Sequence, residues 1–549
     1  MNTRHYPSWP KRLPKTLICP EVPLYDYLEV SARRYPDHTA INYYGNKISY
    51  AQLWSESCCL AGALVAMGVK KGDRVAIYMQ NSPQFIISFF GILRANAVVV
   101  PLNPMLMSRE LAILLGDCGA RVVLAGQELC PQINEVRDLL DLSQVIAVSY
   151  GDYLPQEPCL PVPDFMTQTL NLGEGMVSWQ KIMANPSAPP APDISPDNVC
   201  LIPYTAGSTG IPKGCMHTHK TVGANTISSF HWMNFTASTV SLCVLPLFHV
   251  TGLINSLLAP MFGGGTLVLL TRWDRTAALD AIETLGCNCV VAISTMIVDL
   301  LAAPDVNSRD LSSLGAVAGG GAPLPAAVGE KLKALTGLTY VEGYGMTETI
   351  SQTHFNPPDR AKLGSIGVPD FGVDARIIDV DDNGELPPGK EGELIINGPE
   401  VFKGYWNKPR ETEESFLELD GKQFFRTGDI CRMDEEGYFF IVDRCKRMIN
   451  AAGFKVWPAE VESLLYGHPD VLEACVVGVP DPVRVENVKA FIVPQKGRKK
   501  TISTQEIMAW AKERMSAYKY PRIIDFVDSL PKSGAGKILW RELQEKEQR

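Results

Sequence analysis

Helical periods alternate with apolar, β-branched runs through the first 200 residues, and this alternation restricts the possible folds more than any other feature of the sequence. We expect helices at Tyr50–Met67 and Pro83–Ala95. We expect strands at Arg74–Tyr78, Val98–Pro101 and Arg121–Leu124. Helices between consecutive buried strands are typical of βαβ units, whose strands form a parallel sheet. The alternation resumes between residues 198 and 356, so the sequence predicts two α/β sheet regions.

The remaining segments have other patterns. Residues 152–196 are rich in Pro and polar residues and are predicted to be surface loop. Between residues 364 and 440, turns such as Asp381–Gly384 separate short strands, which indicates a small β-barrel-like region. Helices near Pro458–Tyr466 and Thr504–Met515 indicate a compact α+β unit. We therefore expect an α/β protein with a large N-terminal domain (residues 1–443), made of two α/β sheet subdomains and a small β-barrel-like subdomain, and an α+β C-terminal domain (residues 444–549).

Length, charge and hydropathy exclude several classes of protein. The 549 residues are 46% hydrophobic and 20% charged, which is typical of a globular protein of several units. A net charge of −9 argues against a nucleic-acid-binding surface. The N-terminus lacks the apolar run of a signal peptide. Only Val250–Leu270 approaches the length of a membrane span, but Asn255, Pro260 and three consecutive glycines would break a spanning helix. We expect a buried helix, a glycine turn and the strand Thr266–Leu270 there, and no membrane span.

The 14 cysteines include no CxxC pair and no zinc-binding spacing. A disulfide framework is unusual in a chain of this length without a secretion signal. We expect free thiols in a reducing, cytoplasmic environment.

A glycine-rich loop, Tyr204–Gly214 (YTAGSTGIPKG), follows the apolar run Val199–Pro203. Its glycines allow backbone N–H groups to approach an anion, while Ser208, Thr209 and Lys213 supply hydroxyls and a positive charge. The loop is not a Walker A motif, which requires GxxxxGK followed by Ser or Thr. The sequence therefore predicts a phosphate site of another kind.

Further motifs follow this loop in order: Gly319–Pro323 (GGGAP), Gly343–Glu348 (GYGMTE), Arg426–Asp429 (RTGD), Arg444 with Gly453–Glu462, and Pro531–Lys537. Taken singly, a Thr-Glu pair is often a helix cap and an RTGD tetrapeptide is often a turn. In this order they resemble the adenylate-forming enzymes, which include acyl-CoA synthetases, firefly luciferase and peptide-synthetase adenylation domains. The resemblance covers residues 25–545, with Ala206 and Ser208 as minor departures in the loop.

The resemblance implies a site for ATP and Mg²⁺. Tyr344 would pack on adenine, Thr347 would contact phosphate, Asp429 would bind the ribose hydroxyls, and Glu348 would hold Mg²⁺ together with Thr209. The other residues that the resemblance assigns to the nucleotide are Thr205, Ser208, Lys213, Gly320, Gly321, Ala322, Glu342 and Gly343. A carboxylate that attacks a phosphate must overcome like-charge repulsion, so cations such as Lys213, Lys537 and Mg²⁺ are needed there.

The resemblance also implies that the C-terminal domain is a mobile lid. Lys446, two residues after Arg444, would be its hinge, and Lys537 would be the catalytic lysine of the first step. Gly453 and Lys455 would face the acyl-phosphate or the pantetheine of CoA in the second step. Val485 stands where the family more usually has Gly, directly before Glu486, near the expected CoA-facing region.

The segment Pro246–Gly252 resembles the acyl-pocket segment of acyl-CoA synthetases, with His249, a further predicted catalytic residue, at the pocket mouth. It contains no aspartate to pair with a substrate ammonium, and an unpaired buried ammonium would cost several kcal/mol, so amino acids should be poor substrates. The neighbouring segments Phe230–Met233 and Thr295–Val298 are apolar or aromatic, which suits a hydrophobic tail but equally suits plain core.

We therefore expect an AMP-forming acid–thiol ligase that converts a medium- or long-chain fatty acid to its CoA thioester with Mg·ATP. The alternatives are an aryl acid–CoA ligase, an adenylating enzyme that loads a carrier protein, a luciferase-like oxidase, and a catalytically dead nucleotide-binding protein. The sequence allows a homodimer without requiring one.

Overall fold

The structure is a computed structural model that describes residues 3–205, 212–321, 324–444, 447–451, 454–481, 485–495, 502–515, 518–532 and 538–547. For Arg444, Asn450, Phe454, Lys455 and Val485 it describes the backbone. The chain divides into two compact units. Unit 1 consists of Met1–Asp374, Ile396–Phe425 and Glu436–Tyr438, and unit 2 of Ala375–Ile395, Arg426–Glu435 and Phe439–Arg549.

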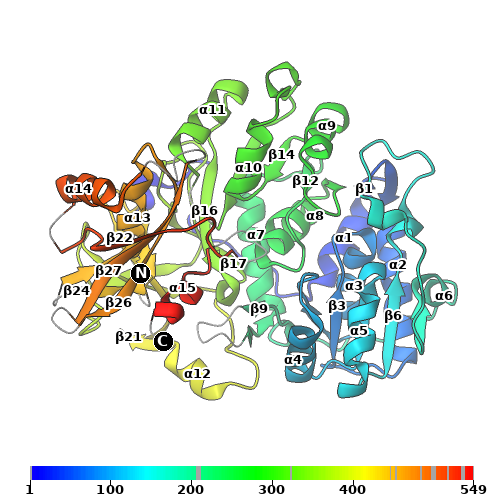
Figure 1. Ribbon diagram of the computed structural model, residues 1–549. Helices are drawn as coiled ribbons and strands as arrows, with labels where there is room; N and C mark the ends of the chain where they lie inside the picture. Colours follow the sequence, from blue (N-terminus) through cyan, green and yellow to red (C-terminus); the bar gives the residue numbers. More distant parts are fainter. Residues whose placement is uncertain are drawn as a thin grey trace. The chain divides into compact units, whose positions relative to one another are not determined.

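The first α/β region of unit 1 is a sheet in the order β11-β8-β4-β3-β5-β6-β7, in which β11 runs antiparallel to β8 and the following pairs run parallel. In chain order its strands are β3 (Arg74–Tyr78), β4 (Val98–Pro101), β5 (Val122–Gly126), β6 (Gln144–Val148), β7 (Met176–Ser178), β8 (Val199–Leu201) and β11 (His217–Thr218). The helices around it are α2 (Tyr50–Ala66), α3 (Pro83–Arg94), α4 (Ser108–Cys118), α5 (Cys130–Val136) and α6 (Trp179–Met183) (Figure 1).

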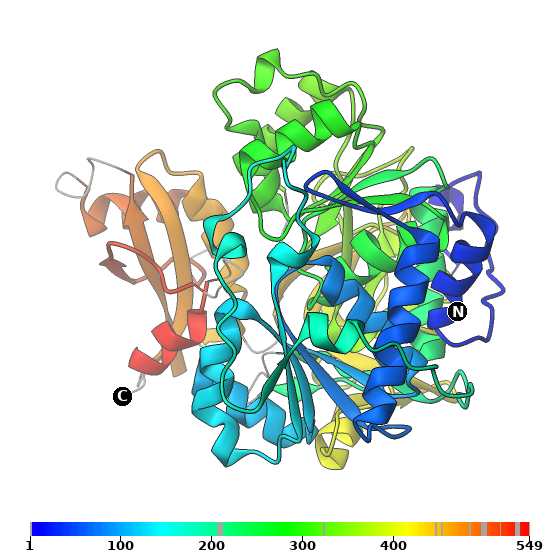
Figure 2. The ribbon, with the colours of Figure 1, turned by 90° about the vertical axis from the view of Figure 1, so that its right-hand side faces the viewer.

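Helices cover both faces of this sheet. Val75 and Ile77 belong to the core formed with α2 and α3, whereas Ala76 and Tyr78, on the opposite face, belong to the core formed with α4 and α5. Figure 2 shows the blue helices on one side of these strands and the cyan helices on the other. Because both faces are buried, β3, β4 and β5 are nearly continuous apolar runs, and those runs alone predicted these three strands.

The second α/β region of unit 1 is a sheet in the order β18-β17-β16-β15-β14-β12-β13-β1-β2. The pairs from β16 to β1 run parallel, and the outer pairs run antiparallel. Its strands are β1 (Thr39–Tyr43), β2 (Asn46–Ser49), β12 (Val240–Cys243), β13 (Thr266–Leu269), β14 (Cys289–Val291), β15 (Ala316–Gly320), β16 (Val341–Met346), β17 (Ser351–Phe355) and β18 (Val368–Pro369). Helices α1 (Tyr25–Arg34), α7 (His219–Met233), α9 (Arg275–Leu285), α10 (Ser294–Leu301) and α11 (Ala326–Thr336) accompany it. The predicted α/β class with two sheet regions is confirmed.

The apolar segment Val250–Leu270 contains the predicted buried helix, glycine turn and strand. Its helix begins as a π-helix, η6 (Gly252–Leu258), and continues as α8 (Ala259–Phe262), and β13 follows the glycine turn. None of the described helices is both long and apolar enough to cross a membrane.

The prediction of surface loop for residues 152–196 is wrong in its middle part. Strand β7 adds to the sheet edge beside β6, and α6 follows it. Trp179 is 2% exposed and packs in the core, as does Met166. Single apolar residues spaced among many prolines and polar residues were too weak a periodic signal to predict these elements.

The region from residue 374 to 444 is rich in strands, as the turn pattern predicts. It contains β19 (Asp374–Ile378), β20 (Glu391–Asn397), the short helix α12 (Pro409–Glu414), β21 (Phe416–Leu419), β22 (Lys422–Met433) and β23 (Phe439–Arg444). In unit 1, β21 forms a hairpin with the first part of β22, and in unit 2 the second part of β22 pairs with β23.

The C-terminal part of unit 2 is an α+β fold around a sheet in the order β25-β24-β27-β26, with β28 beside β27. Helices α13 and α14 pack on one face against Ala474 and Val476, and α15 packs on the other against Cys475 and Val477. Its elements are β24 (Ile449–Ala451), β25 (Phe454–Val456), α13 (Pro458–Tyr466), β26 (Val471–Asp481), β27 (Val485–Pro494), α14 (Thr504–Arg514), β28 (Ile523–Phe526) and α15 (Trp540–Glu547). The expected α+β character of this region is thus present, and Val485 begins β27 opposite Ala451.

Candidate active site

Several predicted site residues of unit 1 follow the carboxyl ends of parallel strands in the second sheet. His249 follows β12, Gly320 ends β15 and Gly321 follows it, and Thr347 and Glu348 come directly after β16. Because the carboxyl ends of parallel strands meet at one edge of a sheet, this edge is where α/β proteins bind ligands. The fold therefore places these residues along a single edge.

The two described ends of the predicted phosphate loop pair as a small hairpin. Strand β9 (Tyr204–Thr205) pairs antiparallel with β10 (Lys213–Gly214), so Thr205 lies opposite Lys213. The Tyr204 hydroxyl donates to Asp117 Oδ2 at 2.5 Å, which ties this hairpin to α4. Ser208 and Thr209 lie outside the described residues, and so does Ala322 of the second predicted loop.

Glycine is required where β15 meets β16. A Cβ atom on Gly320 would lie 2.4 Å from the carbonyl oxygen of Gly343, and Gly321 has a φ of +86°. Side chains are thereby excluded from the surface beside Tyr344, and a bare backbone surface suits a flat ring. Tyr344 itself is 7% exposed and packs edge-on against His354, with ring centroids 5.9 Å apart.

Glu342 supports the loop after β15. Its carboxylate Oε1 accepts a hydrogen bond from the Leu324 N–H at 2.8 Å. Burial raises the pKa of this carboxyl above its ordinary value, and the hydrogen bond from Leu324 opposes that rise. Glu342 therefore anchors the chain at Leu324, directly after the predicted adenine-side loop.

Glu348 is in a buried turn, η8 (Thr347–Thr349), and is 7% exposed. Its Oε1 accepts a hydrogen bond from the Tyr405 hydroxyl at 2.9 Å, and its carbonyl oxygen accepts one from the Phe402 N–H at 2.9 Å. His217 Nε2 lies 2.7 Å from the carbonyl oxygen of Thr347. The turn that carries the signature Thr-Glu pair is thus fixed from two sides.

His217 is the neutral donor of this arrangement. Burial lowers the pKa of its imidazole to about 4, although the hydrogen bond to Thr347 opposes that effect. Because a carbonyl oxygen only accepts, Nε2 carries the proton, and Nδ1 faces the Thr221 hydroxyl at 3.3 Å.

Lys213 and Glu348 meet on the same tyrosine. The Lys213 ammonium lies 4.7 Å from the centroid of the Tyr405 ring, whose hydroxyl binds Glu348. Tyr405 was not among the predicted site residues. It belongs to a turn-rich segment 57 residues after Glu348, and its only sequence signal was a Gly-Tyr pair.

Glu348 suits a magnesium ion better than a metal of all-protein coordination. The described residues contain no cluster of three or more His, Cys, Asp or Glu side chains that could hold a metal. Mg²⁺ is usually bound by one or two carboxylates together with phosphate oxygens and water, so the single carboxylate of Glu348 suits it. When bound, Mg²⁺ would neutralise charge on the phosphates.

His249, in the middle of the predicted acyl-pocket segment, is exposed, and its Nδ1 accepts a hydrogen bond from the Thr251 N–H at 3.3 Å. Behind it, η6 contributes Asn255 to a buried polar cluster. Asn255 Nδ2 donates to Ser351 Oγ and to Gln352 Oε1, both at 3.1 Å, and Ser229 Oγ lies 2.7 Å from Asn255 Oδ1. These bonds join η6 to α7 and to β17, the strand after η8. The cluster was not predicted from the sequence.

Asp429 lies in unit 2, where it is 2% exposed. Its N–H donates to Thr427 Oγ1 at 3.1 Å, and the Thr427 hydroxyl donates to the Leu394 carbonyl oxygen at 2.7 Å. Glu393 accepts from Arg426 Nε at 3.0 Å and from the Gly428 N–H at 3.2 Å. The Arg-Thr-Gly-Asp stretch, which lies within β22 and is not a turn, is therefore tied to β20.

Two of the remaining predicted residues, Arg444 and Lys455, are placed by their backbone. Arg444 ends β23 opposite Asp429, and Lys455 lies in β25 opposite Asn450. Lys446, Gly453 and Lys537 lie outside the described residues.

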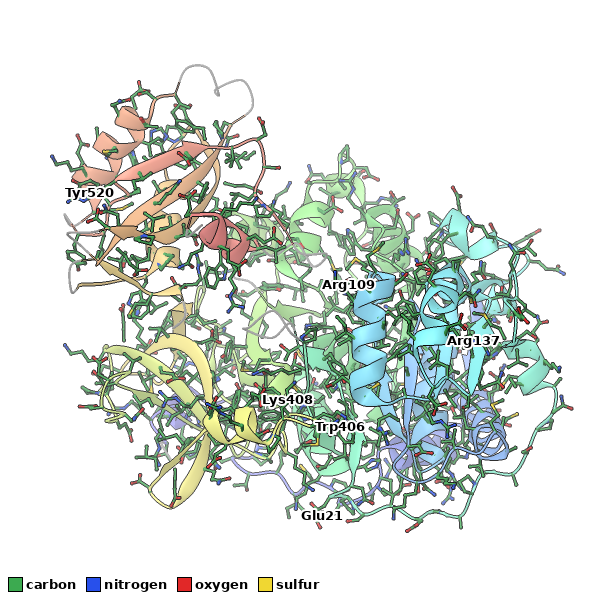
Figure 3. All side chains as sticks on the ribbon, turned by 60° about the horizontal axis from the view of Figure 1, so that its bottom comes forward. Glu21, Arg109, Arg137, Trp406, Lys408 and Tyr520 are labelled. Carbon is green, nitrogen blue, oxygen red and sulfur yellow. The ribbon has the colours of Figure 1, made fainter. Side chains whose placement is uncertain are left out.

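A cavity of about 1030 Å³ opens beside the segment that carries Tyr405. Phe402, Tyr405 and Met216 form part of its wall, and Lys408 lies where the segment leads into α12. Figure 3 labels Lys408, which lines this cavity, and Trp406, which directly follows Tyr405.

Comparison with known proteins gives a consistent result. The AMP-binding enzyme family matches residues 28–406, and the AMP-binding enzyme C-terminal domain matches residues 460–537. The chain is 37% identical over 551 residues to a long-chain-fatty-acid–CoA ligase of Bacillus subtilis (strain 168), with 98% of this chain and 97% of the relative covered. It is also 37% identical to a feruloyl-CoA synthase of an Amycolatopsis species over 518 residues, which cover 93% of this chain and 96% of that one. The crystal structure of ATP-bound MatB from Rhodopseudomonas palustris is similar in fold, with a TM-score of 0.85, 29% identity, and 96% of this chain and 99% of that chain covered.

Proposed function

The chain belongs to the AMP-binding enzyme family and is an AMP-forming acid–CoA ligase, and from this premise we propose that its acid substrate is a medium- or long-chain fatty acid. ATP and CoA are its other substrates. The observation that carries the proposal is the match to the Bacillus subtilis ligase, which extends over nearly the whole of both chains. The absence of an aspartate from Pro246–Gly252 also favours an uncharged acyl tail over an amino acid.

An aryl acid is the second candidate. The feruloyl-CoA synthase is as similar in sequence as the fatty-acid ligase, at 37% identity. A pocket for a phenolic acid and a pocket for an alkyl chain both need apolar walls, so overall similarity favours neither by itself.

The reaction has two steps. In the first, a carboxylate oxygen of the acid attacks the α-phosphorus of ATP, and pyrophosphate leaves. In the second, the sulfur of CoA attacks the acyl carbon of the mixed anhydride, and AMP leaves with the oxygen that joined it to the acyl group. We assign Lys213 and Lys537 to charge neutralisation in the first step, because like charges must approach there. Glu348 would hold the magnesium ion, and Asp429 the ribose.

We also propose that residues 444–549 act as a lid that turns at Lys446 between the two steps. The separate family match of residues 460–537 and the separate hydrophobic core of that region support this division. We place the enzyme in the cytoplasm, where both ATP and CoA are supplied.

A chain-length series tests the proposed substrate. The measurement is kcat/KM for CoA-thioester formation with acetate, hexanoate, octanoate and palmitate, with ferulate and an amino acid alongside. Each buried CH₂ contributes about 0.8 kcal/mol, so affinity should rise roughly fourfold per methylene until the pocket is full. A higher kcat/KM for acetate than for octanoate, or the highest value for ferulate, would refute the fatty-acid proposal and leave the ligase activity itself intact.

A further inference from the structure

The segment Phe402–Trp406, which we call the Tyr405 segment, is anchored to two elements of the candidate site. Cys215, next to β10, and Tyr405 face each other as an isolated antiparallel pair. The backbone bonds that hold the segment are Phe402 N–H to the Glu348 oxygen, Lys403 N–H to the Met216 oxygen and Met216 N–H to the Gly404 oxygen, each 2.9 Å, and Trp406 N–H to the Gly214 oxygen, 2.8 Å. The backbone of Tyr405 is therefore fixed relative to both the phosphate-loop hairpin and η8.

The side chain of Tyr405 contacts the charged group of each element. Its hydroxyl donates to Glu348 Oε1 at 2.9 Å, and the Lys213 ammonium lies over its ring, 4.7 Å from the centroid. Tyr405 is 8% exposed, so both contacts are shielded from water. A carboxylate oxygen accepts hydrogen bonds, so the Tyr405 hydroxyl is the donor of this contact.

These two contacts separate opposite charges that would otherwise attract each other. Within the described residues, no carboxylate forms an ion pair with Lys213. An ion pair between Lys213 and Glu348 would neutralise both groups, which would then be less available to phosphate and to a metal ion. A cation over an aromatic face keeps its charge, and a neutral hydroxyl donor does not remove the charge of the carboxylate that accepts from it.

We propose that Tyr405 is a positioning residue that orients Glu348 for Mg²⁺ through its hydroxyl and holds Lys213 toward the phosphates through its ring. The proposal rests on the nucleotide-site roles proposed above for Glu348 and Lys213. The hydroxyl and the ring of Tyr405 thus have separate functions, and different substitutions at this position distinguish them.

The test compares Tyr405→Phe with Tyr405→Leu by calorimetric titration of ATP, with Mg²⁺ and in its absence. Tyr405→Phe removes the hydroxyl and keeps the ring, so Mg·ATP affinity should fall roughly tenfold, the size of one hydrogen bond to a charged group, while metal-free ATP affinity stays unchanged. Tyr405→Leu removes both contacts, so the metal-free affinity should fall as well. The KM for Mg·ATP should follow the binding data, and the KM for CoA should not.

Tyr153→Phe is the matched control, because the Tyr153 hydroxyl also donates to a glutamate, Glu56, at 2.6 Å and lies in the first sheet region. The proposal is overturned if Tyr405→Phe binds Mg·ATP as Tyr153→Phe does, or if it weakens metal-free and Mg-bound ATP equally. Should Tyr405→Phe not fold, Thr412→Val removes the 2.9 Å bond from the Tyr405 N–H and should weaken Mg·ATP selectively, to a smaller extent. Glu348→Gln distinguishes failure of the Tyr405 proposal from failure of the proposed nucleotide site. If this variant binds Mg·ATP normally, the nucleotide site itself is wrongly placed.

Discussion

At the scale of residues, two buried histidines at the start of α7 make stability depend on pH. Burial lowers the pKa of His217 and of His219 from 6.5 to about 4 in each case. His219 Nδ1 accepts a hydrogen bond from the Leu24 N–H at 3.0 Å, which a protonated ring could not do. The folded protein therefore binds these protons less readily than the unfolded chain.

We expect the free energy of unfolding to decrease as the pH falls from 6.5 toward 4. Because the folded-state pKa is the lower one, the contribution of His219 is complete above pH 6.5 and is lost in that interval, up to about 3 kcal/mol. His219→Gln cannot be protonated and should reduce the dependence, while His217 still contributes its part. Urea unfolding of the variant between pH 4.5 and 8 measures this, with the exposed His38→Gln as control; an unchanged slope in His219→Gln would contradict the assignment.

Individual site residues could be predicted only where chemistry required a residue type in a recognisable order. Glu348 and Lys213 were predicted because they lie in glycine-containing motifs. Tyr405 and Asn255 were not, because their roles depend on contacts across 57 and 96 positions of the chain. No local pattern reports such contacts.

At the scale of elements, β3, β4 and β5 were predicted closely because their residues are buried on both faces, whereas β7 was wrongly predicted to be loop. The predicted bounds of β3, β4 and α13 agree with the structure. The π-helical form of η6 was not predicted, since its apolar residues are buried on all sides and carry no period. The π-helical segment contains Asn255, the residue of η6 that belongs to the polar cluster. Turns of π-helix are frequent at functional sites.

Asn255→Leu tests whether this cluster holds η6 in place. The substitution leaves Ser229, Ser351 and Gln352 with fewer partners in a buried region, so we expect a loss of about 2–4 kcal/mol in unfolding free energy. The KM for the acid should rise more than the KM for ATP, because η6 follows the predicted acyl-pocket segment. The measurements are urea unfolding and steady-state kinetics.

Ser256→Ala is the control in the same helix. Its hydroxyl is buried and has no hydrogen-bond partner among the described residues, so its removal should be neutral or slightly stabilising. Equal effects of Asn255→Leu and Ser256→Ala would mean that the cluster has no special role.

At the scale of the whole molecule, the order of motifs predicted the family and the α/β architecture, whereas length and composition indicated only a globular protein of several units. The compact units are not continuous along the chain, since unit 2 combines Ala375–Ile395 and Arg426–Glu435 with Phe439–Arg549. Sequence patterns follow the chain, and a unit assembled from separated segments leaves no continuous signal.

The proposed lid makes the two half-reactions separable. Lys537→Ala should abolish acyl-AMP formation, because a cation is missing at the phosphate, and should still convert supplied acyl-AMP and CoA to thioester. Lys446→Pro fixes φ near −65° and should still form acyl-AMP with one burst of pyrophosphate, then stall before the thioester. Loss of both half-reactions in folded Lys537→Ala, or normal turnover of Lys446→Pro, would exclude the lid mechanism.

The most direct test of the central claim, AMP-forming ligation through an acyl-adenylate, follows the oxygen of the acid. Octanoate labelled with ¹⁸O in its carboxylate is incubated with the enzyme, Mg·ATP and CoA, and the products are analysed by mass spectrometry. Attack of the carboxylate on the α-phosphorus transfers one labelled oxygen to AMP, so the account predicts one ¹⁸O in AMP for each thioester formed and unlabelled pyrophosphate. Label in inorganic phosphate with ADP as the nucleotide product, or AMP without label, would contradict it.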